Sequence, residues 1–167
     1  DGYRPDGNCS ACVVEINGER TLAPSCCRSA TAGMEVKANS ERALKSQKLV
    51  LEMLLSDMPD KGYKWVGDDD AERERQQHGE LSEWASRLNV SVRPELKALQ
   101  RHQPAADLSH PAMAVNLDAC IQCNRCVRAC REEQVNDVIG YAMRGAHSEI
   151  VFDLNDPMGL STCVACG

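Results

Sequence analysis

Ten of the 167 residues are cysteine, and their spacing restricts the possible folds of this chain more than any other feature. The densest group has two residues between successive members and three before the last: Cys120, Cys123, Cys126 and Cys130. This C-x2-C-x2-C-x3-C run is the spacing with which bacterial proteins bind four-iron clusters. A second pair, Cys163 and Cys166, begins the same pattern again. We therefore expect this part of the chain to fold around [4Fe-4S] clusters.

The spacing also predicts which cysteines share a cluster. Where two such runs occur, the fourth cysteine of each run ligates the other cluster. A first [4Fe-4S] cluster is then expected on Cys120, Cys123 and Cys126, and a second on Cys130, Cys163 and Cys166. The remaining ligand of each cluster is expected beyond Gly167.

A third group of cysteines has the spacing of a [2Fe-2S] site. Its members are Cys9, Cys12 and Cys26. The fourth ligand is expected before Asp1, although Cys27 directly follows Cys26. Two neighbouring thiolates rarely reach one small cluster productively, so we interpret Cys27 as a buried or spare thiol.

Two other uses of the cysteines compete with iron–sulfur clusters. Disulfide frameworks belong to small secreted chains, and no signal peptide opens this sequence, which begins with a loop-like stretch. Paired C-x2-C motifs also build zinc ribbons. Successive two-residue intervals favour a cubane over tetrahedral zinc, and a zinc-stabilised binding module without a redox role stays open as an alternative.

Composition narrows the class of protein further. Hydrophobic residues make up 43% of the chain but aromatic residues only 4%, which favours several small cluster-organised units over one large core. The net charge is −6, and no basic stripe of the nucleic-acid-binding kind is present. No apolar run reaches the length of a membrane span. We expect a cytoplasmic protein with no nucleic-acid partner and no membrane span.

Turn and helix signals divide the chain into segments. Residues 12–16 favour a strand, Asn17-Gly18 a hairpin turn, 19–22 the returning strand and 34–37 another strand. Ser40 is a suitable N-cap for a helix bounded by Pro59. Further on we expect a linker at 60–70, one or two helices at 71–88, short helices at 93–101 and 124–133, a hairpin of 138–144 with 149–153, and a loop at 155–160.

No substrate-binding chemistry is indicated by the other residue types. The four histidines, His78, His102, His110 and His147, are isolated in the sequence. No nucleophile with an adjacent base, phosphate-binding glycine loop or paired acid/base carboxylates stand out. We therefore predict no catalytic residue in this chain.

Two blocks of sequence resemble a known group of oxidoreductases. Residues Asp1–Glu15 with Leu22–Cys26 resemble the N-terminal two-iron domain of complex I 75-kDa-type subunits, iron-only hydrogenases, the diaphorase subunit of NAD-reducing hydrogenases, and the alpha subunit of NAD-dependent molybdenum or tungsten formate dehydrogenases. The block Cys120–Gly140, with its run Arg125 to Gln134, is most similar to the formate dehydrogenase alpha subunit.

This resemblance implies an α+β fold in three parts. Residues 1–39 would be a β-grasp two-iron ferredoxin domain truncated at its N-terminus, 40–113 a helical connecting region, and 114–167 a two-cubane ferredoxin domain truncated at its C-terminus.

The resemblance also implies a function and partners. Formate would be oxidised at a molybdenum or tungsten molybdopterin (bis-guanine dinucleotide) centre outside this sequence. Electrons would pass through one [2Fe-2S] and two [4Fe-4S] clusters to a flavin subunit that reduces NAD, within a hetero-oligomer. The corresponding module of an iron-only hydrogenase, or of a NAD-reducing hydrogenase diaphorase subunit, is the alternative.

One departure from the family pattern is informative. These families often carry a cluster bound by one histidine and three cysteines after a helix ending in His-Pro. Here the matching position is Met58-Pro59, and residues 60–110 contain no cysteine. The resemblance therefore implies that this cluster is absent, which argues against a complex I subunit.

Overall fold

The structure, a computed structural model, describes residues 4–59 and 80–166. These residues form two compact units, one of residues 4–56 with 80–98 and the other of 57–59 with 99–166. The boundaries of the units do not coincide with the three predicted segments, whose assignment as functional domains stays a prediction. The linker predicted at 60–70 and the first half of the helical region predicted at 71–88 lie outside the described residues.

The first unit is built on a small antiparallel sheet of order β2-β1-β3. Its strands are β1 (Val13–Ile16), β2 (Ala23–Pro24) and β3 (Val36–Lys37). The predicted hairpin is present, but its returning strand begins at Ala23 and not at residue 19. Ala23 is buried opposite Val14, whereas the polar Arg20 and Thr21 are exposed. Burial of the apolar face therefore selects the later start of the strand.

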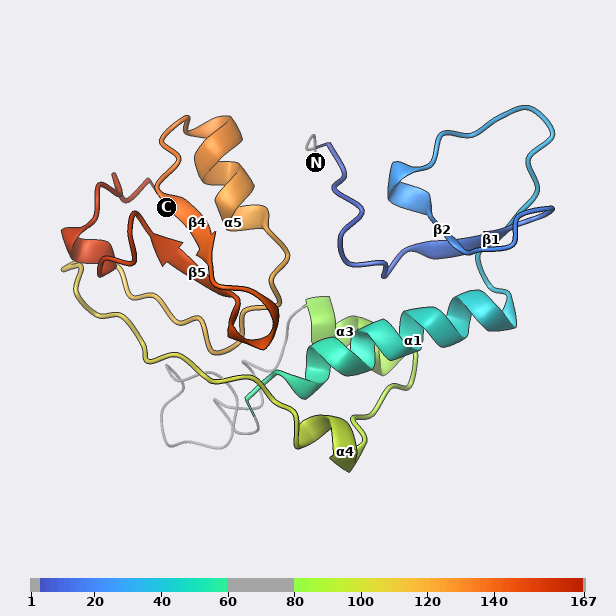
Figure 1. The fold of residues 1–167 in the computed structure, drawn as a ribbon, viewed down its shortest axis with the longest axis horizontal. Helices are drawn as coiled ribbons and strands as arrows, with labels where there is room; N and C mark the ends of the chain where they lie inside the picture. Colours follow the sequence, from blue (N-terminus) through green and yellow to red (C-terminus); the bar gives the residue numbers. More distant parts are fainter. Residues whose placement is uncertain (1–3, 60–79, 167) are drawn as a thin grey trace. The chain divides into compact units, whose positions relative to one another are not determined.

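Helix α1 (Glu41–Ser56) packs against this sheet (Figure 1). It begins where predicted, because the Ser40 hydroxyl accepts the Ala43 N–H at 3.3 Å and satisfies one of the free donors of the first turn. The Gln47 side chain donates to the Val13 carbonyl at 2.9 Å. Val14, Ile16 and Ala23 form the buried apolar cluster on the sheet. The helix thus holds the central strand through both packing and a direct hydrogen bond.

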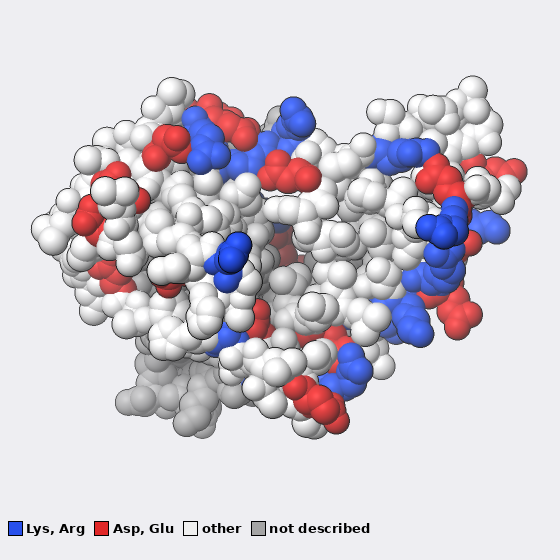
Figure 2. Space-filling model, viewed as in Figure 1, with Lys and Arg blue, Asp and Glu red and all other residues white. Residues whose placement is uncertain are grey.

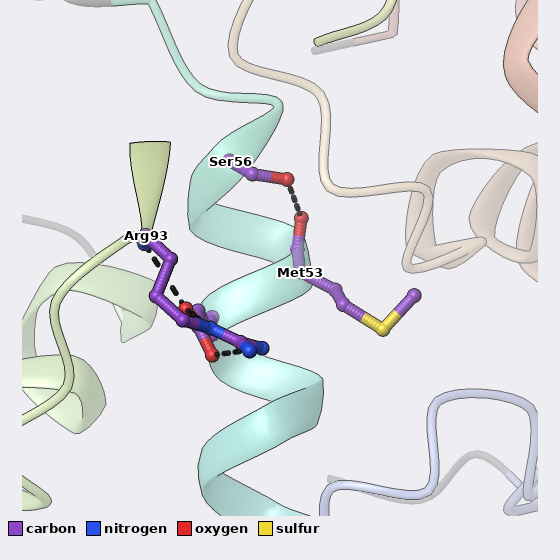
Figure 3. A network of polar contacts seen from close by, with 4 residues as sticks. Met53, Ser56 and Arg93 are labelled. Carbon is purple, nitrogen blue, oxygen red and sulfur yellow. Dashed lines mark hydrogen bonds and ion pairs between the residues drawn. The ribbon is translucent and has the colours of Figure 1, made fainter. Parts of the chain in front are cut away.

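Two shorter helices complete the first unit, α3 (Glu80–Arg87) and α4 (Pro94–Lys97). Arg93, just before α4, donates to the Glu52 carboxylate of α1 through its backbone N–H at 3.0 Å, its Nε at 2.7 Å and an Nη at 3.1 Å (Figure 3). Glu52 is only 7% exposed, and hydrogen bonds from Arg93 hold the pKa of its carboxyl below the ordinary value. This bidentate pair ties α4 to α1.

Helix α4 is shorter than the predicted helix over 93–101. After Lys97 the chain enters the second unit, where the Gln100 side chain donates to the Met58 carbonyl at 2.8 Å. The Arg101 N–H donates to the Asp57 carboxylate at 3.1 Å. These contacts with residues over forty positions earlier replace the continuation of the helix.

The second unit contains the predicted hairpin, formed by β4 (Ile139–Ala142) and β5 (Glu149–Phe152). The two strands pair antiparallel from Ile139 opposite Phe152 to Ala142 opposite Glu149. The single-turn 3-10 helix η3 (Gly145–His147) connects them. Phe152 is buried against Val138, Met158 and Cys130, which together form the apolar core of this unit.

Helical turns cover this core. The helix predicted over 124–133 is present as α5 (Arg125–Arg128) followed by the π-helical turn η2 (Ala129–Glu133). The Gln134 N–H reaches back to the Ala129 carbonyl at 3.1 Å, the wider spacing of a π-turn. Such turns occur frequently at functional sites.

The loop predicted over 155–160 contains a further short helix, η4 (Met158–Leu160). The Met158 N–H donates to the Asp107 carboxylate at 2.7 Å, and the Met158 side chain enters the core at 3% exposure. The prediction of a loop is therefore wrong at this point, because a contact with a residue far away in the sequence orders the turn.

The charges of the described residues are mixed on the face in Figure 2, where Lys and Arg alternate with Asp and Glu and form no continuous basic stripe. Within residues 4–59 and 80–166, no helix combines the length and the apolar character needed to cross a lipid bilayer.

Candidate metal centre

All ten cysteines of the chain are free thiols. Within residues 4–59 and 80–166, no three His, Cys, Asp or Glu side chains meet closely enough to bind one metal ion. An iron–sulfur cluster makes a different demand, because its thiolates bind separate iron atoms of an extended core. The relevant test is whether cysteines of each predicted set lie on neighbouring elements.

Cys12 and Cys26 lie together at one end of the β1–β2 pair. Cys12 precedes β1, Cys26 follows β2 in the 3-10 helix η1 (Ser25–Cys27), and the Ser25 N–H donates to the Cys12 carbonyl at 3.2 Å. Pairing of Val13 with Pro24 brings these two cysteines, far apart in sequence, to the same place.

The pKa values of the two thiols shift in opposite directions. Burial raises the pKa of the Cys12 thiol, but the backbone N–H and thiol of Cys26, with further help from Ser25, outweigh this and lower it. The hydrogen bond to Cys12 raises the pKa of Cys26 to about 12. Cys12 is therefore the more acidic thiol of the pair.

The other two cysteines of this region are exposed. Cys9 lies in the loop before β1, and the contact between Cys12 and Cys26 forms without it. Cys27 is exposed and not buried, with its Sγ 3.7 Å from the Sγ of Cys26.

The first predicted [4Fe-4S] set lies close enough together for Cys120 and Cys123 to affect the pKa of the Cys126 thiol. Burial raises the pKa of the Cys126 thiol, and the neighbouring Cys120 and Cys123 raise it further. The Gln122 N–H donates to the Cys120 Sγ at 3.4 Å. Backbone N–H donors to cysteine sulfur are among the features that set the potential of an iron–sulfur cluster.

The core of the second unit includes Cys130, and Cys163 packs against it. Cys130 is buried, its Sγ accepts the Val138 N–H at 3.3 Å, and Cys163 packs against the same apolar cluster. Cys166, the third member of this predicted set, is exposed near the end of the described chain. Cys130 and Cys163 therefore share one apolar core.

The first C-x2-C turn of each cysteine run in this unit has the same backbone feature. Gln122, directly before Cys123, and Ala165, directly before Cys166, both have left-handed backbone with φ of 53° and 50°. Such values are uncommon for residues other than glycine and cluster at functional sites. Both turns therefore reverse the chain in the same way between their cysteines.

Two side chains beside the first cysteine set have no signal in the sequence. Burial raises the pKa of Tyr141 in β4, as do the nearby Cys120, Cys126 and Cys123. Arg101 donates from its guanidinium to the Cys120 carbonyl and lines a cavity of about 230 Å³ with His102 and His147. Only the tertiary fold brings these residues to the cysteine loop.

The donor set fits iron–sulfur clusters. It consists of unpaired thiols on tight turns, with backbone N–H donors directed at sulfur. Thiolates are the ligands of these clusters, which supply one-electron chemistry when bound.

Comparison with protein families agrees with this fit. Residues 1–41 match the family described as the 2Fe-2S iron-sulfur cluster binding domain.

Individual relatives cover the rest of the chain. The chain is 33% identical to the NADP-reducing hydrogenase subunit HndD of Solidesulfovibrio fructosivorans, over 96% of this chain and 26% of the relative. It is 29% identical to the mitochondrial NADH-ubiquinone oxidoreductase 78 kDa subunit of Candida albicans, over 86% and 19%. It is 26% identical to the putative formate dehydrogenase SH0748 of Staphylococcus haemolyticus, over 98% and 15%. The chain therefore spans about a quarter or less of these relatives.

A solved structure shares the fold. A chain of a NAD+-reducing [NiFe]-hydrogenase superposes with a TM-score of 0.74 at 24% identity, over 97% of this chain and 64% of that one. The chain is therefore similar, over most of its length, to part of NADP-reducing hydrogenase, NADH-ubiquinone oxidoreductase and putative formate dehydrogenase proteins, and its residues 1–41 match a two-iron cluster binding domain.

Proposed function

We propose that this chain is the electron-relay module of a NAD-dependent formate dehydrogenase. The grouping of the thiols is the observation that supports an electron relay. The groups are Cys12 with Cys26, Cys126 near Cys120 and Cys123, and Cys130 with Cys163. Formate would be oxidised at a molybdopterin centre elsewhere in the protein, and electrons would leave through a flavin subunit to NAD.

The proposed ligands follow the three groups. The [2Fe-2S] cluster takes Cys9, Cys12 and Cys26, the first [4Fe-4S] cluster takes Cys120, Cys123 and Cys126, and the second takes Cys130, Cys163 and Cys166. Cys9 and Cys166 are exposed, as are Cys26, Cys123 and Cys126. Each set is completed by a ligand outside this sequence.

The formate assignment rests on sequence features within the relay. The run from Arg125 to Gln134 resembles the formate dehydrogenase alpha subunit, and two putative formate dehydrogenases align over nearly the whole chain. Residues 60–110 lack the cysteines of a further cluster, which disfavours a complex I subunit.

A hydrogenase is the second candidate, because the identity to the NADP-reducing hydrogenase subunit reaches 33% over 96% of this chain. In that assignment the same relay would carry electrons between hydrogen and a nicotinamide nucleotide. The arrangement of the thiols supports both candidates equally.

Substrate-dependent reduction distinguishes the candidates. The full-length protein, purified anaerobically with its partner subunits, is assayed for NAD reduction with formate and with hydrogen, and analysed for molybdenum and tungsten. Formate-dependent reduction with one of these metals present supports the proposal. Hydrogen-dependent reduction without either metal would assign the chain to a hydrogenase.

The metal content tests the relay itself. An iron-loaded, brown protein with reducible paramagnetic signals is expected. A colourless protein loaded with zinc would refute both redox candidates and leave the zinc-stabilised binding module.

A further inference from the structure

We propose that Cys27 is a reserve ligand of the two-iron cluster, which takes the place of Cys26 when that thiolate is lost. The inference rests on the proposed [2Fe-2S] site. It assigns a role to a thiol that the spacing of the motif does not require.

The separation of the two sulfur atoms supports this role. Two thiolates on one tetrahedral metal, each at about 2.3 Å, lie about 3.8 Å apart. The Sγ atoms of Cys26 and Cys27 are 3.7 Å apart. An iron atom bound by one sulfur therefore lies within reach of the other.

The local packing leaves both side chains free to turn. Cys26 and Cys27 are exposed, and η1, which contains them, has no buried residue. Rotation of a cysteine between staggered rotamers moves its sulfur by about 3 Å. Adjacent positions in the sequence are therefore no obstacle to exchange here, contrary to the expectation from spacing.

The loop before β1 leaves room for the Cys27 thiol. The Sγ of Cys27 lies 3.8 Å from the Pro5 carbonyl, and a Cβ at Gly7 would stand 2.7 Å from this sulfur. The Cys27 sulfur thus lies near both Cys26 and the loop that carries Cys9.

The exchange requires no oxidant or reductant. The Cys27 thiol gives its proton to solvent and forms an iron–sulfur bond. Where Cys26 is still present, its bond to iron breaks and its sulfur takes up a proton, so one ligand replaces another and the cluster keeps its electrons.

Paired alanine variants of the full-length protein test the inference. We compare wild type, Cys26→Ala, Cys12→Ala and the double variant Cys26→Ala/Cys27→Ala by iron content and by the paramagnetic signal of the reduced two-iron cluster. Cys26→Ala is expected to retain the signal with shifted g-values, whereas the double variant loses it. Cys12→Ala, which has no adjacent thiol, is the matched control and is also expected to lose it.

The outcomes separate this inference from the proposed function. Loss of the signal in Cys26→Ala alone, with an intact wild-type signal, would overturn the reserve ligand and leave the relay standing. Absence of a two-iron signal in wild type would overturn the proposed site and this inference with it.

A serine variant covers the case in which Cys26→Ala does not fold. Cys26→Ser keeps a polar side chain of similar size. If Cys26→Ser has the spectrum of an all-sulfur two-iron cluster, and this spectrum disappears when Cys27→Ala is added, the exchange is supported. An oxygen-ligated or missing cluster in Cys26→Ser refutes it.

Discussion

Ala165 is held in the left-handed backbone region immediately before a proposed ligand, with φ of 50°. Left-handed backbone costs a residue with a Cβ roughly 1–2 kcal/mol, and a β-branched residue tolerates it least. The strain is local to the Cys163–Cys166 turn.

Substitutions at Ala165 measure this strain. Ala165→Val is expected to destabilise the iron-loaded protein by more than about 1 kcal/mol, whereas Ala165→Gly is expected to be neutral or stabilising. Thermal bleaching of the cluster absorbance ranks the stabilities of the variants. Val164→Ala, at an exposed neighbouring position, is the control, and equal effects of valine and glycine at 165 would contradict the role of the backbone.

Cys126, a member of the first proposed set, lies in the first turn of α5. Cys126→Ala is expected to remove one four-iron cluster and to destabilise the second unit, because ligand binding and folding are coupled. Iron analysis of the full-length protein measures the loss, and unchanged iron content would rule out this ligand assignment.

At the scale of elements, the β4–β5 hairpin is anchored by one aromatic side chain. Phe152, the sole phenylalanine of the chain, is buried against Val138 and Met158. Phe152→Ala is expected to destabilise the second unit by about 3–5 kcal/mol through lost burial and a residual cavity.

The matched control lies two residues further along. Leu154 is 94% exposed, so Leu154→Ala is expected to change stability by less than about 0.5 kcal/mol. Denaturant unfolding of the two variants gives the comparison, and similar losses would show that Phe152 does not organise the core.

The contact between α1 and α4 is expected to depend on pH. Arg93 lowers the pKa of Glu52, so the pair stabilises the fold above the ordinary glutamate pKa of about 4.3. This contribution is lost as the pH falls through the lowered pKa. The difference in Tm between wild type and Glu52→Gln is therefore expected to be present at neutral pH and to disappear in acid.

Thermal unfolding across this range tests the helix pair. Glu83→Gln, which changes an exposed carboxylate on α3, is expected to give a small difference at every pH. A Glu52→Gln effect that is independent of pH would show that packing, and not the ion pair, holds α4.

At the scale of the whole molecule, the apolar core and the proposed metal ligands overlap in the second unit but not in the first. Cys130 and Cys163 belong to the same cluster as Phe152, whereas the buried cluster of the first unit contains Val14, Ile16 and Ala23 and no cysteine. Loss of metal is therefore expected to destabilise the second unit more than the first.

Chelation of iron under reducing conditions tests this asymmetry. Hydrogen exchange read by mass spectrometry is expected to show large losses of protection in peptides from 125–163, because folding there includes the ligands. Peptides from α1 serve as the internal control and are expected to change less. Equal losses in both units would refute the asymmetry.

Local signals in the sequence were sufficient to predict several secondary-structure elements. Ser40 caps α1 as predicted because an N-cap bond spans only three residues. Asn17-Gly18 and the segment around Gly145 lie in the connections of two antiparallel pairs. The predicted elements were wrong where residues distant in the sequence determine the local structure. Burial of Ala23 sets the start of β2, and Asp107 orders the turn at Met158.

The sequence by itself was sufficient to predict iron–sulfur ligands, because that prediction uses only the short intervals between cysteines, which local backbone geometry controls. The tertiary structure alone brought Cys130 into one core with Cys163, Arg93 onto Glu52, and Arg101 and Tyr141 beside the first cysteine set. It also placed the Sγ of Cys27 3.7 Å from the Sγ of Cys26. These contacts depend on which apolar faces are buried together across long stretches of chain, and no interval in the sequence encodes that choice.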